Sequence, residues 1–223
     1  MDTQSLRLAF LKQRGWKPRQ VLDIGAHKGA WALAFCSVFP TARIFMIEAD
    51  ERHRPFLDAA GFPYQIGLVG RSATMVPFHT LENAELSQGA SIYRENTAIY
   101  NQTGLTLTVP MSRLDDLVEE VGLADVNFIK LDVQGAEIDV LEGAHHLLAT
   151  HPVDFVLAEL SLIRFNEGAP LADEVIAYMR GHGFGLHDIF ELHYWNDQLI
   201  QIDVLFARDR LLTSELLVQR SGH

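Results

Sequence analysis

Four short apolar runs, each followed by a helical pattern or a turn, constrain the fold of this chain more than any other feature. They cover Val21–Ile24, Ile44–Ile47, Phe128–Leu131 and Phe155–Leu157. Apolar strands without polar alternation are typical of a parallel sheet that is covered on both faces. Because helical segments separate these runs, the pattern predicts an α/β fold with a mostly parallel sheet.

The remaining periodicity predicts the other elements. Thr80–Gly104 is polar and lacks periodicity, and a span of that kind inside a compact domain is usually functional or mobile, so we interpret it as an insert that forms a lid. The final two strands would be joined by a turn at His193–Asp197. Strands are expected at Gln20–Ile24, Arg43–Glu48, Tyr64–Val69, Ala73–His79, Leu105–Pro110, Asn127–Asp132, Asp154–Leu160, Phe184–Glu191 and Gln201–Ala207. Helices are expected at Ser5–Arg14, Gly29–Phe39, Glu51–Ala60, Leu114–Val121, Ala136–Leu148 and Leu171–His182.

Charge and length limit the partners and the domain count. The chain has 223 residues, enough for one large domain, and its formal charge of −11 disfavours nucleic acid as a partner. No run approaches the roughly 20 apolar residues of a membrane span, and Met1–Leu11 lacks a signal-peptide pattern. With Cys36 as the single cysteine, expected to be a buried thiol, we expect a cytoplasmic protein, a small-molecule partner and, on base rates, a homodimer.

The sharpest local signal is the strand-to-helix turn at residues 21–29. It places Asp23, Gly25 and Gly29 between an apolar strand and a helix. Glycines at such a turn allow a ligand to approach the backbone, and the helix start offers free N–H groups. The turn therefore predicts a binding site for a ligand with an anionic group, and a plain tight turn is the alternative.

The details of this turn argue against a dinucleotide. His27 stands where a dinucleotide-binding fingerprint has its second glycine, and Asp23 would repel a phosphate but attract an ammonium group. An amino acid or the methionine part of S-adenosylmethionine fits better. Glu48 ends the next strand, at the place where an acid typically bonds ribose hydroxyls. A solvated charge is the alternative for Glu48, and His27 could either cap its helix or touch the cofactor.

Three segments together resemble the FkbM family of class I S-adenosylmethionine-dependent methyltransferases. They are Asp23–Gly29, Ile47–Asp50 and Phe128–Glu137, and the resemblance extends from about Val21 to about His187. The block Lys130-Leu-Asp-Val-Gln-Gly-Ala-Glu137 is its family-specific part. The family usually has Asn in place of His27 and often Glu in place of Gln134.

The resemblance implies a Rossmann-like three-layer sandwich whose seven-stranded sheet is mostly parallel, with the last strand antiparallel. It implies a methyltransferase domain over residues 20–210 with an insert at 80–104, a helical extension at 1–19 and a tail at 211–223. Ser91 is our choice for a hydroxyl in the pocket. The full set expected to contact the cofactor is Asp23, Gly25, Ala26, His27, Gly29, Glu48, Ala49, Asp50, Gly67, Leu68, Ser91, Asp132 and Val133.

Catalytic candidates are expected where strands end. Asp132 and Glu159 follow two apolar strands, and if these strands are adjacent both carboxylates could act as a base or hold a Mg²⁺ ion. A purely cofactor-orienting role is the alternative for Asp132. His187 is a further candidate base, with a hydrogen-bonded core position as its alternative. Lys130 is expected to form a structural ion pair with a carboxylate such as Glu137.

These observations predict an S-adenosylmethionine-dependent O-methyltransferase acting on a hydroxyl of a small molecule, a sugar or a natural product. Two alternatives stay open. One is an NAD-dependent oxidoreductase on a related sheet, against which His27 argues. The other is a non-catalytic module that keeps the cofactor pocket.

Overall fold

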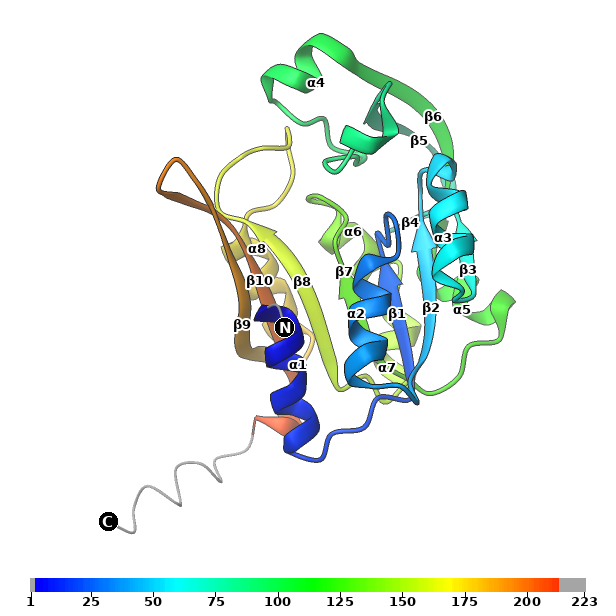
Figure 1. Ribbon diagram of the computed structural model, residues 1–223, viewed down its shortest axis with the longest axis vertical. Helices are drawn as coiled ribbons and strands as arrows, with labels where there is room; N and C mark the ends of the chain where they lie inside the picture. The colour runs from blue at the N-terminus through cyan, green and yellow to red at the C-terminus, as the bar shows by residue number, and fades with distance from the viewer. Residues whose placement is uncertain (1–2, 213–223) are drawn as a thin grey trace.

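A seven-stranded sheet forms the centre of the computed structural model, which describes residues 3–212 (Figure 1). From one edge to the other, its strands are β3 (Tyr64–Ile66), β2 (Arg43–Glu48), β1 (Gln20–Ile24), β7 (Val126–Leu131), β8 (Phe155–Ser161), β10 (Gln198–Arg208) and β9 (Phe184–Trp195). Strands β3, β2, β1, β7 and β8 run parallel, and β10 is antiparallel to both of its neighbours. The predicted mostly parallel sheet with an antiparallel last strand is confirmed.

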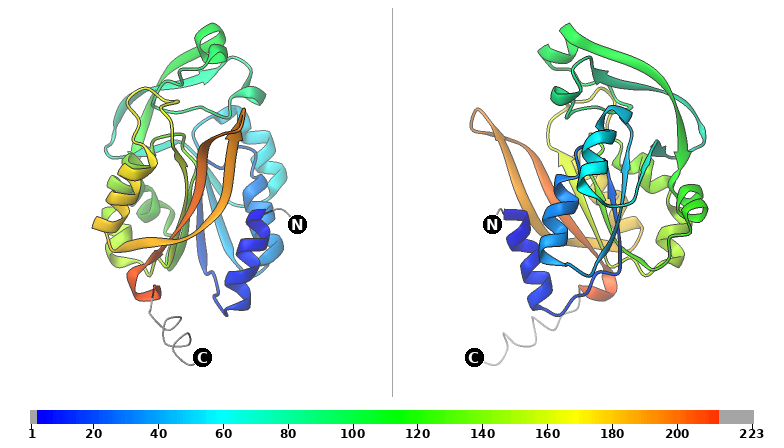
Figure 2. Two further views of the ribbon diagram at one scale, coloured as in Figure 1. Left: turned by 90° about the vertical axis from the view of Figure 1, so that its left-hand side faces the viewer. Right: turned by 45° about the vertical axis from the view of Figure 1, so that its right-hand side comes forward.

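Helices cover both faces of this sheet, which makes three layers (Figure 2, left). Alternate residues of β1 point to opposite faces, so Val21 belongs to one apolar cluster and Leu22 to the other. This is why β1 and β7 are mostly apolar and are buried throughout. One face carries α1 (Thr3–Gln13), α2 (Ala30–Val38) and α3 (Arg54–Ala60), and the other carries α5 (Leu114–Val121), α6 (Glu137–Glu142), α7 (His145–Thr150) and α8 (Ala172–Gly181).

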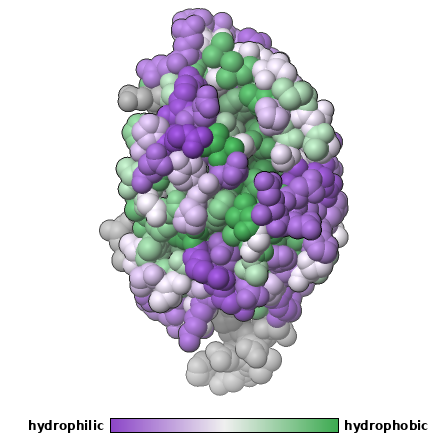
Figure 3. All heavy atoms as spheres, turned by 90° about the vertical axis from the view of Figure 1, so that its right-hand side faces the viewer, coloured by the Kyte–Doolittle hydropathy of each residue, from purple (hydrophilic) through white to green (hydrophobic). Residues whose placement is uncertain are grey.

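A second, three-stranded sheet projects beyond the carboxyl ends of the parallel strands (Figures 1 and 2). It consists of β4 (Leu68–Gly70), β6 (Gly104–Arg113) and β5 (Thr74–Leu81), with α4 (Ala98–Thr103) between β5 and β6. Short 3-10 turns lie at Glu51–His53, Ala84–Leu86 and Asp209–Leu211. Seen from the β3 edge, hydrophobic residues of the molecule lie in recesses between protruding hydrophilic ones (Figure 3).

Two predicted elements are each divided in two. The strand expected at Tyr64–Val69 breaks at Gly67, whose N–H donates the last hydrogen bond to β2, at Glu48 O, before the chain crosses to the second sheet. The helix expected at Ala136–Leu148 breaks at Gly143, which packs so closely on Gly70 that a Cβ would lie 2.0 Å from its carbonyl oxygen. The Asp115 carboxylate then accepts N–H groups at the start of α7.

The final hairpin is longer than predicted. Strand β9 runs through Trp195 and β10 begins at Gln198, so the turn is reduced to Asn196 and Asp197. Both turn residues have left-handed φ angles, 46° and 62°, which Asn and Asp tolerate better than most residues. As a result His193 belongs to a strand rather than to the expected turn.

The structure also bears on the predictions made for the N-terminal helix, the cysteine and the C-terminal tail. Helix α1 packs against the sheet, and Cys36 on α2 is only partly buried rather than fully buried. Within residues 3–212, we find no helix that is both long and apolar enough to cross a membrane. The predicted tail at 211–223 lies, from residue 213 onward, outside the described residues.

Candidate active site

The turn between β1 and α2 brings two backbones into close contact. Gly25 has a φ of 76°, and a Cβ there would lie 1.9 Å from the carbonyl oxygen of Asp132. Gly29 has a φ of 74°, and His27 between them also has a left-handed φ, of 50°. The turn therefore needs glycine at position 25 for two independent reasons, conformation and space.

A buried cation lies beneath this turn. Lys130 Nζ lies 3.1 Å from Asp23 Oδ1 and 3.3 Å from Asp132 Oδ2, and it donates a hydrogen bond of 2.9 Å to Gly25 O. Burial opposes the charge of Lys130, but the carboxylates of Asp23 and Asp132 outweigh it and raise the pKa of the amine. The expected structural ion pair of Lys130 is confirmed, but its partners are Asp23 and Asp132 and not Glu137, which turns back to accept the N–H of Gly135. Lys130 thus neutralises Asp23, which we expected to meet a ligand.

Glu48 is held rigidly at the end of β2. Its two carboxylate oxygens accept the backbone N–H groups of His27, at 2.6 Å, and of Asp50, at 2.8 Å. The ring of His53 lies beside it, with Nδ1 3.4 Å from Glu48 Oε1. Asp50 instead directs its carboxylate to Arg52, whose hydrogen bonds hold the Asp50 pKa low although burial opposes this.

A cleft of about 1000 Å³ opens at the carboxyl ends of the parallel strands. Most of the cofactor-binding and catalytic residues predicted from the sequence line this cleft. Ten of them line it, and they are Gly25, His27, Glu48, Ala49, Gly67, Leu68, Ser91, Asp132, Val133 and Glu159. Five others, Asp23, Ala26, Gly29, Asp50 and His187, are outside this lining.

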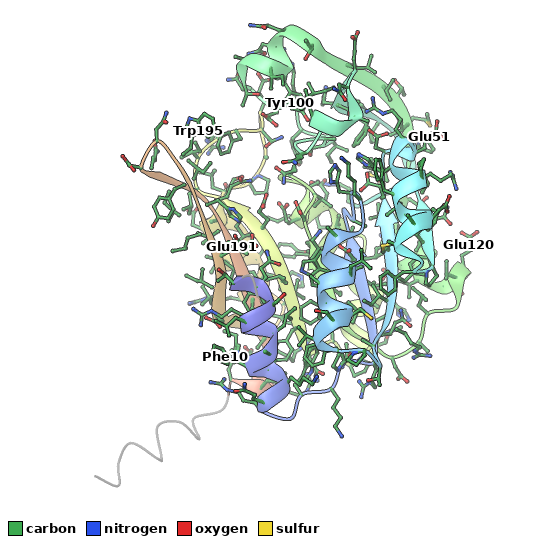
Figure 4. The ribbon with its side chains drawn as sticks, viewed as in Figure 1. Phe10, Glu51, Tyr100, Glu120, Glu191 and Trp195 are labelled. Carbon is green, nitrogen blue, oxygen red and sulfur yellow. The ribbon has the colours of Figure 1, made fainter. Side chains whose placement is uncertain are left out.

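The segment predicted to be a lid forms one wall of the cleft. Residues 87–92 and 97–99 line it, and Ser91 donates from its hydroxyl to Val133 O over 3.2 Å. Trp195, at the tip of the β9–β10 hairpin, lines it as well. In Figure 4, the label Trp195 marks the tip of this hairpin and the label Tyr100 marks α4.

Asp132 and Glu159 meet as expected, but through an amide. Strands β7 and β8 are neighbours, with Leu131 paired to Ala158, so the two acids follow side by side. Gln134 Nε2 donates to Asp132 Oδ1 over 2.9 Å and to Glu159 Oε1 over 2.6 Å. The space between the carboxylates is therefore taken by a neutral donor, which a metal ion would have to displace.

Sequence reasoning missed the histidine and the acid that join this group from the final hairpin. One ligand-type atom from each of Glu159, His193 and Asp203 lies within 4.8 Å of the others. The available signal was the alternation of β10, where Asp203 interrupts an apolar run. His187, the histidine on β9 that we predicted as a candidate base, lies outside the cleft lining. Its ring packs on Phe155, with the two ring centroids 5.6 Å apart.

The buried Glu137 makes stability depend on pH. Burial raises the pKa of this carboxyl to about 7 from 4.5, so the folded protein binds the proton more tightly than the unfolded chain. The stabilisation is complete below about pH 4.5 and is lost as the pH rises through about 7. The unmutated protein should therefore lose up to about 3 kcal/mol of unfolding free energy between pH 5 and pH 8. Glu137→Gln should not show this loss, because its amide does not titrate. Urea unfolding at both pH values measures this, with the exposed Glu120→Gln as control. The prediction is contradicted if Glu137→Gln and the unmutated protein change in unfolding free energy by the same amount between the two pH values.

The strand order and the position of the cleft define a class of protein, the S-adenosylmethionine-dependent methyltransferase fold. Among solved structures, the chain is similar to magnesium protoporphyrin IX methyltransferase from Synechocystis PCC 6803 (TM-score 0.52, 8% identity, 92% of this chain and 78% of that one). It is also similar to a precorrin-6y C5,15-methyltransferase from Geobacter metallireducens (TM-score 0.50, 8% identity, covering 92% of this chain and 86% of that one). At these identities the likeness shows the fold alone.

The sequence comparison then places the chain in a family. Residues 23–186 match the methyltransferase FkbM domain, and the chain belongs to this family. It is 28% identical over 162 residues to 2-O-methyltransferase NoeI of Sinorhizobium fredii, covering 66% of this chain and 65% of NoeI. It is 26% identical over 199 residues to the antimetabolite synthetase AmbE of Pseudomonas aeruginosa. The chain spans less than two thirds of either relative, and only 9% of AmbE.

Proposed function

We propose that this protein transfers a methyl group from S-adenosylmethionine to a hydroxyl oxygen of a small molecule, a sugar or a natural product. The observation that carries the proposal is the cleft with a crowded glycine turn at one end and the rigid Glu48 carboxylate beside it. The residues fit such a cofactor: His27 lines the cleft, and within the described residues its Nε2 is buried without a hydrogen-bond partner. A bound ligand with a polar group would satisfy it.

Residues of the cleft divide along the length of the cofactor. Gly25 and His27 would hold the methionine part, Glu48 would accept the ribose hydroxyls, and Gly67 with Leu68 would lie against adenine. The sulfonium supplies an already activated methyl group, so positioning contributes much of the catalysis. Asp50 would contribute through its backbone, because Arg52 occupies its carboxylate.

The choice of oxygen as acceptor rests on the acids at the strand ends and on the name of the relative NoeI. On this proposal, Asp132 and Glu159 would lie where an acceptor hydroxyl meets the methyl group. Burial, with the charges of Asp132 and Asp203 next, raises the pKa of Glu159. A Mg²⁺ ion on Asp132 and Glu159 would first have to displace Gln134. The net charge of −11 favours a neutral or cationic acceptor over a nucleic acid.

Calorimetry with S-adenosylmethionine tests the cofactor. The unmutated protein should bind it, and Glu48→Gln should weaken binding about 10- to 100-fold because charge-assisted hydrogen bonds to the ribose are lost. Glu51→Gln, an exposed acid three residues further along, is the matched control and should bind normally. Absence of binding by the unmutated protein would sink the proposal, and tighter binding of NADH would favour the oxidoreductase alternative.

The acceptor is tested by mass spectrometry after incubation with S-adenosylmethionine and a panel of methyl glycosides, phenols and hydroxy acids. A mass gain of one methyl group on a hydroxyl-bearing compound is the expected result. Cofactor binding without any transferred methyl group across the panel would favour the non-catalytic module.

A further inference from the structure

A histidine–carboxylate pair from the final hairpin lies beside the cleft. His193 on β9 has its ring Nε2 3.2 Å from Asp203 Oδ1 on β10 and 3.8 Å from Glu159 Oε2 on β8. His193 lines the main cleft and also a smaller adjoining hollow of about 240 Å³. Gly25, Asp132 and Glu159 line both spaces too, so the imidazole lies at the junction next to the expected methionine end.

The sheet holds Asp203 in place from both sides. In the antiparallel register, Asp203 is paired with Glu159 of β8 and with Glu191 of β9. Its second oxygen, Oδ2, accepts a hydrogen bond from Gln4 of α1. Asp203 is nearly fully buried, whereas the His193 side chain keeps about a third of its surface exposed. The acid is thus fixed, and the imidazole that it holds stays accessible.

This contact selects the tautomer of the ring. A carboxylate accepts hydrogen bonds and donates none, so the neutral imidazole places its hydrogen on Nε2, toward Asp203. The lone pair is then on Nδ1, the nitrogen that can accept a proton. This is the arrangement of a general base oriented by an acid.

The electrostatic surroundings strengthen the base. The hydrogen bond to Asp203 is the main cause that raises the pKa of His193, burial opposes it, and the charges of Asp203, Glu159 and Glu191 add to the rise. Glu159 faces the ring from β8, and its own pKa is raised by burial and then by the charges of Asp132 and Asp203. A more basic imidazole is a stronger base, but it removes a proton only in its neutral form, so methyl transfer should increase as the pH rises toward the His193 pKa of about 9.

We propose that His193 is the base that removes the proton of the acceptor hydroxyl, and that Asp203 is the residue that positions it. The inference rests on the proposed function. The hydroxyl proton passes to His193 Nδ1 while the hydroxyl oxygen forms its bond to the methyl carbon. The electron pair of the broken carbon–sulfur bond stays on sulfur, so the products are a methyl ether, a neutral thioether and a protonated imidazole.

The other candidate groups are less suitable. His53 lies beside Glu48, at the expected ribose end, with its Nδ1 3.4 Å from Glu48 Oε1. Glu159 Oε1 already accepts two amide donors, from Gln134 and Gln201. Of the described histidines that line the cleft, His193 lies beside Glu159, whereas His53 lies beside Glu48.

The first experiment follows the ring by nitrogen NMR across a pH titration, which needs no acceptor. We expect the neutral His193 to carry its hydrogen on Nε2 and to titrate above its ordinary value. Asp203→Asn should lower the pKa of His193 by at least one unit, about a tenfold change in proton affinity. Titration at the same pH in both proteins would overturn the pairing.

The second experiment measures methyl transfer to the acceptor found in the panel. His193→Gln should lower kcat about 100-fold or more, the usual contribution of a general base, with S-adenosylmethionine binding unchanged. Asp203→Asn should shift the rising limb of the pH profile toward acid, and the exposed His146→Gln should match the unmutated protein. Full transfer by His193→Gln would overturn this inference alone, whereas no transfer by the unmutated protein would overturn the proposed function.

Discussion

Replacing Gly25 by alanine should abolish measurable binding of S-adenosylmethionine and destabilise the fold by about 3 kcal/mol or more. The added Cβ would lie 1.9 Å from the carbonyl oxygen of Asp132. The backbone segments at Gly25 and Asp132 follow the ends of two adjacent buried strands, so neither can move aside as a flexible side chain would. The left-handed φ of 76° adds a conformational cost of about 1–2 kcal/mol.

Gly61→Ala is the matched control for this substitution. Gly61 has nearly the same φ, 78°, but a Cβ there would meet nothing within 4 Å. It should therefore lose only the conformational part, about 1–2 kcal/mol, and bind the cofactor normally. Urea unfolding and calorimetry on both variants separate the two contributions. Equal losses of stability in the two proteins would show that the contact with Asp132 is not what requires glycine at position 25.

Replacing Lys130 by methionine should cost about 3–5 kcal/mol of unfolding free energy. The substitution leaves Asp23, which is completely buried, without the amine 3.1 Å away. It also leaves Asp23 and Asp132 to repel each other. Burial already raises the pKa of Asp23, so the loss should diminish at acidic pH, where the carboxyl is protonated and cheaper to bury.

A double substitution tests whether the cost comes from the uncompensated charge. Asp23→Asn combined with Lys130→Met should recover much of the stability lost in Lys130→Met alone, because the buried charge is then removed. Lys17→Met, at an exposed lysine, is the control and should stay within about 0.5 kcal/mol. Additive losses in the double variant, measured by urea unfolding, would argue that Asp23 and Lys130 do not act as a pair.

Much of the cleft was predictable because parallel strands end at one edge of a sheet. Glu48, Asp132 and Glu159 each follow or end an apolar run, so their sequence positions alone placed them together. The same logic failed for Asp23, which lies within a strand and not at its end. Its side chain is buried under the turn, where it meets Lys130.

The histidine of the site could not be found in this way. His187 and His193 lie on one strand, and nothing local distinguishes a ring that packs on Phe155 from one that meets Asp203. The difference depends on where β10 enters the sheet and on its register with β8. Such a register is set by packing between segments far apart in the chain.

The sequence by itself determined the α/β class, the helices that cover both faces of the sheet, and the turn that needs glycine at position 25. These follow from local periodicity and from backbone conformation, which neighbouring residues control. Only the tertiary structure decided which polar side chains meet: Lys130 with Asp23, Gln134 between Asp132 and Glu159, and His193 with Asp203. Contacts of this kind depend on distances of a few ångströms between separate strands, and those distances exist only once the sheet has assembled.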